Sequence, residues 1–455
     1  MNSYSYKHMI IPRSNLEPLG LDSRLQLKFI LFTVIMIGSL LYYNEIFAID
    51  EIDGTLNDDD SNNKTLASGV VFSNVTNITN NTKDSVYAQI VANGNNVYVV
   101  WQESITGNPY GNNYEIYFKK SEDNGNTFSK PINLSNNTGF SEHPQIAASK
   151  NGIFIVWADN TDSNNTEIMF TKSVDNGTTF SKPINLSNNS QNSNNQEISA
   201  FNENVYVVWQ DIDQNNNNNK NSSIMFKSSI DSGNTFNDTI ELATNTNDTY
   251  PKVNSYQDYV YIVWNSEENN NLSKDNKNSG LFFIKSSNKG NNFENSIRIA
   301  HNNFGESQIS VSKDEVFIVW GGLYEKNIND IYFVQSDDNG TSFTDPYTIQ
   351  EKVSKPESKN QSDKINHPTN VEITNNDPAY IIVWQDIISK ENQDIFITNI
   401  KNDFQSTKIL NLSNNTGISE CPQIAVSKNF IYVVWEDITT GNHEIFFTRG
   451  QSINK

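Results

Sequence analysis

The chain has 455 residues, of which 36% are hydrophobic and 11% aromatic, and its formal net charge is −21. This aromatic content is too high for a wholly disordered chain. A surface that binds DNA or RNA needs clustered Lys and Arg, so the acidic balance argues against nucleic acid as a partner. Cys421 is the only cysteine, which excludes an intrachain disulfide.

Residues 1–48 form the predicted N-terminal leader. An uncharged, mostly apolar run at 29–44 follows Arg24 and Lys28 and ends shortly before Ala48. A positive flank, a short apolar centre and a small residue after it are typical of a secretory signal. A membrane-spanning helix usually needs about 20 apolar residues, and this run is shorter. We therefore predict export, by a signal peptide that is cleaved or by one that stays as a membrane anchor.

Three segments follow the leader. Residues 49–67 are acidic and polar and are predicted to be a disordered tether. Residues 68–449 contain the repeats described below, and 450–455 form a short tail. N-x-[ST] sequons such as those at Asn74, Asn77 and Asn133 agree with an exported glycoprotein, although an Asn-rich chain also produces them by chance.

Seven segments of the chain share one strand pattern, of which VYVVWQE at 97–103 and IFIVWAD at 153–159 are examples. Every tryptophan occupies the same place in it: Trp101, Trp157, Trp209, Trp264, Trp320, Trp384 and Trp435. The spacings between them are 56, 52, 55, 56, 64 and 51 residues. A period of this size indicates a repeat architecture with one structural unit per tryptophan.

Each repeat contains four predicted short strands, which in the second repeat read PQIAAS, IFIVWAD, EIMFTK and PINLS. The tryptophan strand is apolar on both faces, as expected when neighbouring sheets cover both sides of it. Four-stranded sheets at this period are typical of β-propellers. We therefore predict an all-β fold, a seven-bladed β-propeller with four antiparallel strands in each blade.

The two ends of the repeat region complement each other. The last repeat stops after its third strand, EIFFTR at 444–449, and lacks a fourth. The segment 77–90 aligns without gaps to 133–146, which begins with a fourth strand. We predict that the N-terminal strand completes the last blade, because this closure removes the exposed edges of an open ring.

The turn between the third and fourth strands repeats the pattern S-x-D-x-G-x-T-F at 121–128, 173–180, 229–236 and, with one change, 336–343. It resembles the Asp box, or BNR repeat, of the sialidase-like propeller superfamily, and the resemblance covers about 68–449. The aspartates expected to hold these turns structurally are Asp123, Asp175, Asp231 and Asp338. A calcium loop would need further oxygen ligands after the aspartate, and none follows.

The resemblance implies an activity whose residues this chain lacks. Sialidases hold their anionic substrate with three arginines and use a Tyr–Glu nucleophile pair with an aspartate acid/base. After the leader this chain has two arginines, Arg298 and Arg449, both expected on outer strands. Lys is a poor replacement for the bidentate guanidinium. No catalytic residue can be transferred, and we expect no sialidase activity.

The rim with the long, variable loops is the expected binding face. Its candidate residues follow the tryptophans or begin the inner strands: Glu103, Asp159, Asp211, Asp386, Asp437, Glu142, His143, Glu306, His367, Glu420 and Cys421. Three interpretations stay open for them, namely strand caps, a cation or ligand site, and a carboxylate pair for glycoside hydrolysis. Calcium is the cation that such carboxylates would suit, and the two histidines are alternative metal ligands. No cofactor is otherwise required, and Cys421 is expected to be a small buried residue.

We therefore expect a monomeric, secreted or cell-surface propeller that binds an extracellular glycan or protein. The alternative is a sialidase-like glycoside hydrolase or lyase with a non-standard site. Whether the protein is an enzyme stays open, because the separation between carboxylates cannot be measured from a sequence.

Overall fold

The computed structural model describes residues 64–66, 69–105, 113–161, 165–213, 222–267, 279–301, 306–324, 328–348, 368–376, 379–389, 391–400 and 409–452. All of them belong to one compact unit, Asn62–Lys455. They contain 28 strands, and no helix among them is long and apolar enough to cross a membrane. The predicted leader, 1–48, and the tether as far as residue 63 lie outside the described residues.

Four sheets have four strands each, arranged antiparallel. The first contains β3 (Ser85–Asn93), β4 (Asn96–Ser104), β5 (Tyr114–Ser121) and β6 (Ile132–Asn133). The second contains β7 (Ser141–Ser149), β8 (Gly152–Asp159), β9 (Glu167–Ser173) and β10 (Ile184–Asn185). The third contains β18 (Ser307–Ser312), β19 (Glu315–Tyr324), β20 (Ile328–Ser336) and β21 (Tyr347–Thr348). The fourth contains β22 (Thr369–Asn376), β23 (Ala379–Ser389), β24 (Asn392–Ile400) and β25 (Leu410–Asn411).

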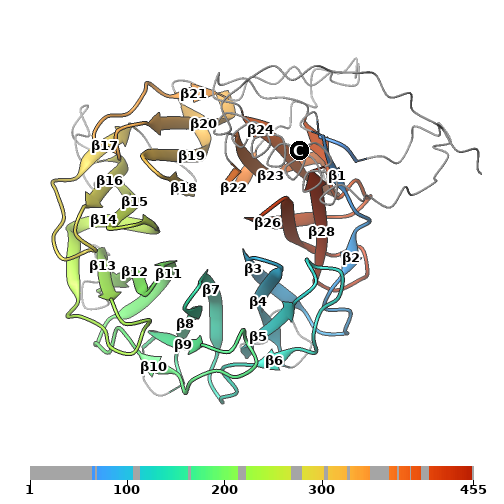
Figure 1. The fold of residues 1–455 in the computed structure, drawn as a ribbon, viewed down its shortest axis with the longest axis horizontal. Coiled ribbons are helices and arrows are strands. Elements are labelled where there is room, and N and C mark those ends of the chain that lie inside the picture. Colours follow the sequence, from blue (N-terminus) through green and yellow to red (C-terminus); the bar gives the residue numbers. More distant parts are fainter. Residues whose placement is uncertain are drawn as a thin grey trace, which may run out of the picture. The chain divides into compact units, whose positions relative to one another are not determined.

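Two larger sheets complete the set. The seven-stranded sheet contains β11 (Asn192–Phe201), β12 (Asn204–Ile212), β13 (Ser222–Ser229), β14 (Ile240–Tyr256), β15 (Tyr259–Glu267), β16 (Gly280–Ser286) and β17 (Ile297–Ala300). The five-stranded sheet contains β26 (Ser419–Ser427), β27 (Phe430–Asp437), β28 (Glu444–Ser452), β1 (Val70–Phe72) and β2 (Thr76–Asn77). Within Asn62–Lys455 the sheets follow one another around a ring, with β3, β7, β11, β18, β22 and β26 innermost (Figure 1).

Hydrogen bonding therefore gives six sheets rather than the seven separate four-stranded sheets predicted. The difference arises at β14, whose Asn247 is in register with Ser222 of β13 and with Glu267 of β15. In the first repeat the Asn133 side chain accepts the N–H of Asn136 and turns the chain after the fourth strand. Glu241 occupies the matching register position of β14, so this turn is lost and the strand continues into the next repeat.

The N-terminal strands close the ring as predicted. Asn77 of β2 pairs with Phe446 of β28, and Val70–Phe72 of β1 pair with the end of the same strand. β28 continues to Ser452, three residues beyond the predicted end of the repeat region at 449. The N-terminal strands β1 and β2 are therefore held in one sheet with the last repeat by backbone hydrogen bonds, and the edge of β28 is covered.

The tryptophan strands β4, β8, β12, β15, β19, β23 and β27 form the core. All seven tryptophans are at most 4% exposed. One cluster packs Tyr98 and Val100 of β4 against Ile153, Ile155 and Trp157 of β8. The core thus lies between neighbouring sheets, which explains why the tryptophan strands are apolar on both faces.

The S-x-D-x-G turns join neighbouring repeats. Asp123 Oδ1 accepts the N–H of Thr127 at 2.9 Å and the hydroxyl of Ser121 at 2.7 Å. Gly125 has a φ of +79°, and a Cβ there would lie 2.6 Å from Cζ of Phe447. Glycine is therefore required at 125, both for the positive φ and for the close contact with Phe447 of the last repeat.

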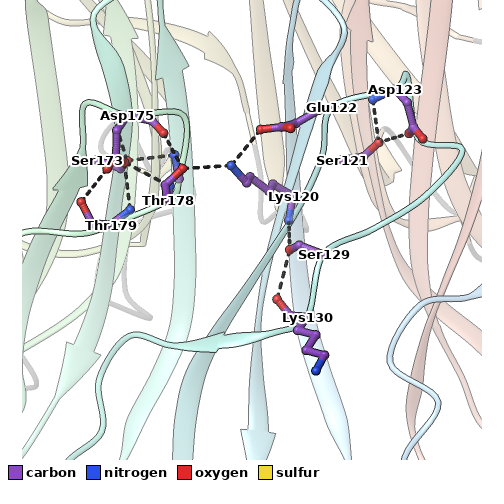
Figure 2. A network of polar contacts seen from close by, with 11 residues as sticks. Lys120, Ser121, Glu122, Asp123, Ser129, Lys130, Ser173, Asp175, Thr178 and Thr179 are labelled. Carbon is purple, nitrogen blue, oxygen red and sulfur yellow. Dashed lines mark hydrogen bonds and ion pairs between the residues drawn. The ribbon is translucent and has the colours of Figure 1, made fainter.

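The other copies of the turn have the same hydrogen bonds. Figure 2 shows Asp175 between Ser173 and Thr179, with distances of 2.7 and 2.6 Å to their hydroxyl groups. Lys120 of the first repeat reaches Thr178 of the second at 3.1 Å. In the fourth repeat Asn288 replaces the aspartate and accepts the hydroxyl of Ser286 at 2.9 Å. These bonds account for the turn aspartates as structural residues.

Candidate functional site

Four of the five acidic residues two positions after the tryptophans, namely Glu103, Asp159, Asp211 and Asp437, are buried inside the fold. Asp159 is buried, and its Oδ2 accepts the indole N–H of Trp157 at 3.0 Å and the hydroxyl of Ser141 at 2.8 Å. The same oxygen accepts the Asn137 amide at 2.8 Å, while Oδ1 accepts the N–H of Thr161. Equivalent indole, hydroxyl and amide donors surround Glu103, Asp211 and Asp437. This arrangement favours strand caps over a cation site, and calcium binding there stays a prediction.

An asparagine that the sequence reasoning missed links each of these carboxylates to the preceding sheet. The backbone N–H of Asn137 donates to Glu115 of β5 at 2.9 Å, and its side chain donates to Asp159 of β8. Asn81, Asn189 and Asn415 make the same two contacts in their repeats. The signal in the sequence was the last Asn of the repeated N-x-[ST]-N-N loops, whose first Asn forms the turn.

The remaining rim candidates do not lie together in one place. Asp386 is half-buried and accepts the N–H of Ile387 at 2.8 Å, and His367 lies outside the described residues. Glu142 is paired with Ala158 across β7 and β8, and Glu420 lies near His443 at the end of the last repeat. The structure brings a different subset of the candidates together at the centre of the ring: His143, Glu306 and Cys421.

A cavity of about 140 Å³ lies where the innermost strands meet. Residues of β3, β7, β11, β14, β22 and β26 line it, together with Glu306 just before β18. Residues at one repeated register position line it and form a polar layer, and hydrogen bonds join Gln145 and Lys252 to Glu197 and Gln423 to Glu372. The members of this layer are Gln89, Gln145, Glu197, Lys252, Glu372 and Gln423.

Two carboxylates organise this polar layer. Glu197 Oε1 lies 2.5 Å from the ammonium of Lys252 and accepts the Gln145 amide at 3.1 Å. Glu372 Oε1 accepts the amide of Gln423 at 2.8 Å and that of Gln308 of β18 at 2.6 Å. The contacts join residues 50 or more positions apart in the sequence, so each one crosses from one repeat to another.

Burial and the carboxylates set the charges of the cavity. Burial raises the pKa of Glu372 to about 8, so this carboxyl is mostly protonated at neutral pH. Burial alone would lower the pKa of Lys252, but Glu197, Glu306 and Glu372 together raise it. Burial also lowers the pKa of His143, which keeps its imidazole neutral. The cavity thus contains one cation whose charge is already matched by neighbouring carboxylates.

Two tyrosines lie at the cavity on residues that bulge from their strands. Tyr87 and Tyr250 have φ values of +53° and +52° and are 45% and 42% exposed. The Tyr87 ring meets the His143 ring edge to face, with centroids 4.4 Å apart. The N–H of Tyr87 donates to Glu436 of the last repeat at 2.7 Å, and that of His143 donates to Gln102. Side chains of neighbouring repeats thus hold the bulges at Tyr87 and His143 in place, and both of these residues and Tyr250 line the cavity.

The sequence contains a signal for this polar layer in the residue pairs that precede three of its members. Three of its members follow a His-Pro, Tyr-Pro or Cys-Pro pair: Gln145, Lys252 and Gln423. The three Pro pairs mark the bulges, where the register shifts between the inner strand and the tryptophan strand. Arg298 and Arg449 lie elsewhere, with bonds to the carbonyls of Ser279 and Asn124.

Comparisons with known proteins support the fold and nothing finer. No family model matches the chain, and no curated protein matches it. A crystal structure of a Dyadobacter fermentans protein of unknown function is similar, with a TM-score of 0.51 and 13% identity over 84% of this chain and 99% of that one.

Two sialidase structures are also similar, at lower TM-scores. Trypanosoma rangeli sialidase in complex with sialic acid has a TM-score of 0.47 and 10% identity over 82% of this chain and 54% of that one. The leech intramolecular trans-sialidase has a TM-score of 0.46 and 13% identity over 84% of this chain and 70% of that one. The chain thus spans about half the length of the trypanosomal enzyme. At this identity the Dyadobacter structure shows a similar fold alone, and the activity stays open.

Proposed function

We propose that this chain is an exported propeller that binds a neutral glycan at the central cavity. The observation that carries the proposal is the combination of two exposed tyrosines with a layer of amide and carboxyl groups around one cavity. Aromatic faces and convergent hydrogen-bonding groups are what a sugar ring with its hydroxyls requires. A volume of about 140 Å³ suits one sugar unit at the end of a chain better than a protein surface.

The charge of the cavity supports a neutral ligand. Lys252 is the cation of the polar layer, and Glu197 is already bonded to it. A carboxylate ligand would also meet the charge of Glu306 and the acidic groups beyond it. Sialic acid and other anionic sugars should therefore bind poorly, and the described residues that line the cavity include no arginine to pair with a carboxylate.

The finer features of the fold belong to the same proposal. The seven tryptophan strands support counting the seven-stranded sheet as two joined blades, which gives seven blades in all. The S-x-D-x-G turns support membership of the Asp-box propellers. Export through residues 1–48, with cleavage or retention as an anchor, and a monomeric state complete the proposed picture. Binding needs no cofactor in this proposal.

A glycan screen with two tyrosine variants tests the binding site. The purified chain should bind one or more neutral glycans, and Tyr250→Ala should abolish that binding. Tyr347→Ala is the matched control, because Tyr347 is equally exposed at 42% but lies outside the cavity. Equal binding by the two variants would place the site elsewhere, and binding restricted to sialylated glycans would contradict the charge argument.

One observation favours hydrolysis as a second candidate. Glu372 is a half-buried carboxyl whose desolvation raises its pKa to about 8, and a neutral carboxylic acid can protonate a leaving group. Glu306 lines the same cavity and would be the partner carboxylate. Incubation of the bound glycan with the chain distinguishes the two functions. Sugar release that Glu372→Gln abolishes, with binding retained, would identify a glycoside hydrolase; intact glycan would identify a binding module.

A further inference from the structure

The last repeat brings three metal-ligating side chains together at one end of its sheet. They are Glu420 of β26, Glu436 of β27 and His443, which immediately precedes β28. One ligand atom from each lies within 4.8 Å of the other two. The imidazole Nδ1 of His443 is 3.7 Å from Oε2 of Glu436 and 4.0 Å from Oε1 of Glu420.

Strand pairing forces the two carboxylates together. Glu420 and Glu436 are direct partners in the register of β26 and β27. Like charges at directly opposed positions destabilise a sheet, and the Glu436 side chain is only 5% exposed. Its Oε1 accepts the backbone N–H of Tyr87 at 2.7 Å, which leaves Oε2 facing the imidazole. A buried carboxylate pair of this kind needs positive charge beside it.

The imidazole of His443 makes no hydrogen bond to either carboxylate. Nδ1 of His443 is a buried atom with no hydrogen-bond partner among the described residues. At 3.7 and 4.0 Å its carboxylate neighbours are beyond hydrogen-bonding distance. A buried ring nitrogen that faces two carboxylates without a hydrogen bond to either of them is costly unless the ring is protonated or a further group, such as a metal ion, lies between them.

The separations fit a single metal ion shared by the three groups. Zinc lies about 2.0–2.2 Å from imidazole nitrogen and carboxylate oxygen, so two tetrahedral ligands are about 3.4 Å apart. The distances from Nδ1 to the two carboxylate oxygens, 3.7 and 4.0 Å, are slightly longer than this value, and all three ligand atoms lie within 4.8 Å of one another. Side-chain rotations would bring them to the separations that one ion requires. One imidazole with two carboxylates is a ligand set for zinc and similar first-row divalent ions rather than for calcium, which takes oxygen ligands.

The sixth repeat shows that the fold does not need this charged cluster. There Gln385 and Gln393 occupy the positions of Glu436 and His443, and Thr369 is paired with Gln385 as Glu420 is with Glu436. The Gln385 amide donates to Gln393 at 3.3 Å, and Gln385 also accepts the N–H of Cys421. That second bond is the counterpart of the one from Tyr87 to Glu436. Neutral residues therefore make every structural contact that this position requires.

We propose that Glu420, Glu436 and His443 bind one divalent transition-metal ion such as Zn²⁺, with the remaining coordination positions open to water. The site lies at the closure of the ring, because Glu436 also bonds to Tyr87 of the first repeat. Metal binding there would hold β26, β27 and the start of β28 together next to the strand that completes the ring. The proposal is independent of the glycan site and of the calcium prediction for the strand caps.

Calorimetric titration of Zn²⁺ into the metal-free full chain tests it. One equivalent should bind, with a rise in melting temperature that grows with free Zn²⁺. The double variant Glu436→Gln with His443→Gln copies the amide pair of the sixth repeat, so it should fold normally while its Zn²⁺ affinity falls by more than about tenfold. Co²⁺ should bind the same site and give the intense visible absorption of a four-coordinate ion.

Two results would overturn the proposal. In the first, Zn²⁺ does not bind the parent chain, which would mean that a protonated His443 alone compensates the carboxylates. In the second, Zn²⁺ binds the double variant as tightly as the parent. Glu142→Gln is the control, since Glu142 occupies the position of Glu420 in the second repeat but faces Ala158. Its Zn²⁺ affinity should equal that of the parent chain.

Discussion

Replacing Trp209 by alanine should destabilise the chain more than almost any other single truncation. The side chain is fully buried and packs with Val205 and Val207 of its own strand against Phe154 and Phe170 of the preceding sheet. Emptying an aromatic core site of this kind costs about 3–5 kcal/mol. Because the cavity would open between two sheets, we expect a value near the top of that range, about 5 kcal/mol.

A phenylalanine at the same position separates packing from hydrogen bonding. The Trp209 indole donates to Asp211 at 2.8 Å, and this carboxylate keeps its bonds from Ser193 and Asn189 when the indole is removed. Trp209→Phe should therefore lose mainly one hydrogen bond to a charged group, about 1.5–3 kcal/mol. The expected order of stability is parent, then the Phe variant, then the Ala variant.

Urea unfolding followed by circular dichroism measures these differences, with equal slopes required before midpoints are compared. Val174→Ala is the control, because Val174 is 74% exposed and its truncation should change stability by less than about 0.5 kcal/mol. If Trp209→Ala lowers the free energy of unfolding by no more than this control does, the core does not lie between the sheets. If the Phe and Ala variants are equally unstable, the indole hydrogen bond rather than packing carries the effect.

Three further predictions concern closure, the turns and the asparagine links. Deleting residues 70–79 should sharply lower the melting temperature in a thermal scan, because β28 would lose its partners β1 and β2; an unchanged melting temperature would rule out closure by these strands. Burial alone would raise the pKa of Asp123, but hydrogen bonds from Thr127, Ser121 and Asn126 lower it from 3.8 to about 2. A carboxyl with a lower pKa in the folded state stabilises the fold above pH 4, and that contribution disappears as the pH falls toward 2. Asp123→Asn should therefore flatten the stability profile measured by urea unfolding from pH 5 to pH 2, and a profile as steep as that of the parent would contradict the turn bonds. Asn137→Ala should cost about 1–3 kcal/mol in the same assay, since Asp159 loses the side-chain amide bond that links the two sheets while the backbone N–H of residue 137 still donates to Glu115; Thr138→Ala, with an exposed side chain in the same loop, is its control.

The rim candidates illustrate how far a strand pattern can be taken. Asp159 stands two residues after Trp157 in a strand, so both side chains leave the strand on the same side. That side is the packed space between two sheets rather than the mouth of the channel, so the carboxylate is buried with the indole and bonded to it. The period of a strand predicts which residues share a face, but only the neighbouring sheet determines whether that face is open to solvent.

The sequence by itself determined the repeat, the buried tryptophan strands and the closure by the N-terminal strand, since these follow from a local pattern repeated in register. It did not determine that β14 joins two repeats. The loss of the turn that Asn133 forms in the first repeat has this effect only because β13 and β15 both pair with β14. Nor did it bring Glu197 to Lys252, or Glu372 to Gln308 and Gln423. These contacts cross between repeats, and their distances depend on how many sheets surround the centre and how each is tilted. Tertiary structure alone therefore decided the cavity and the charge balance within it.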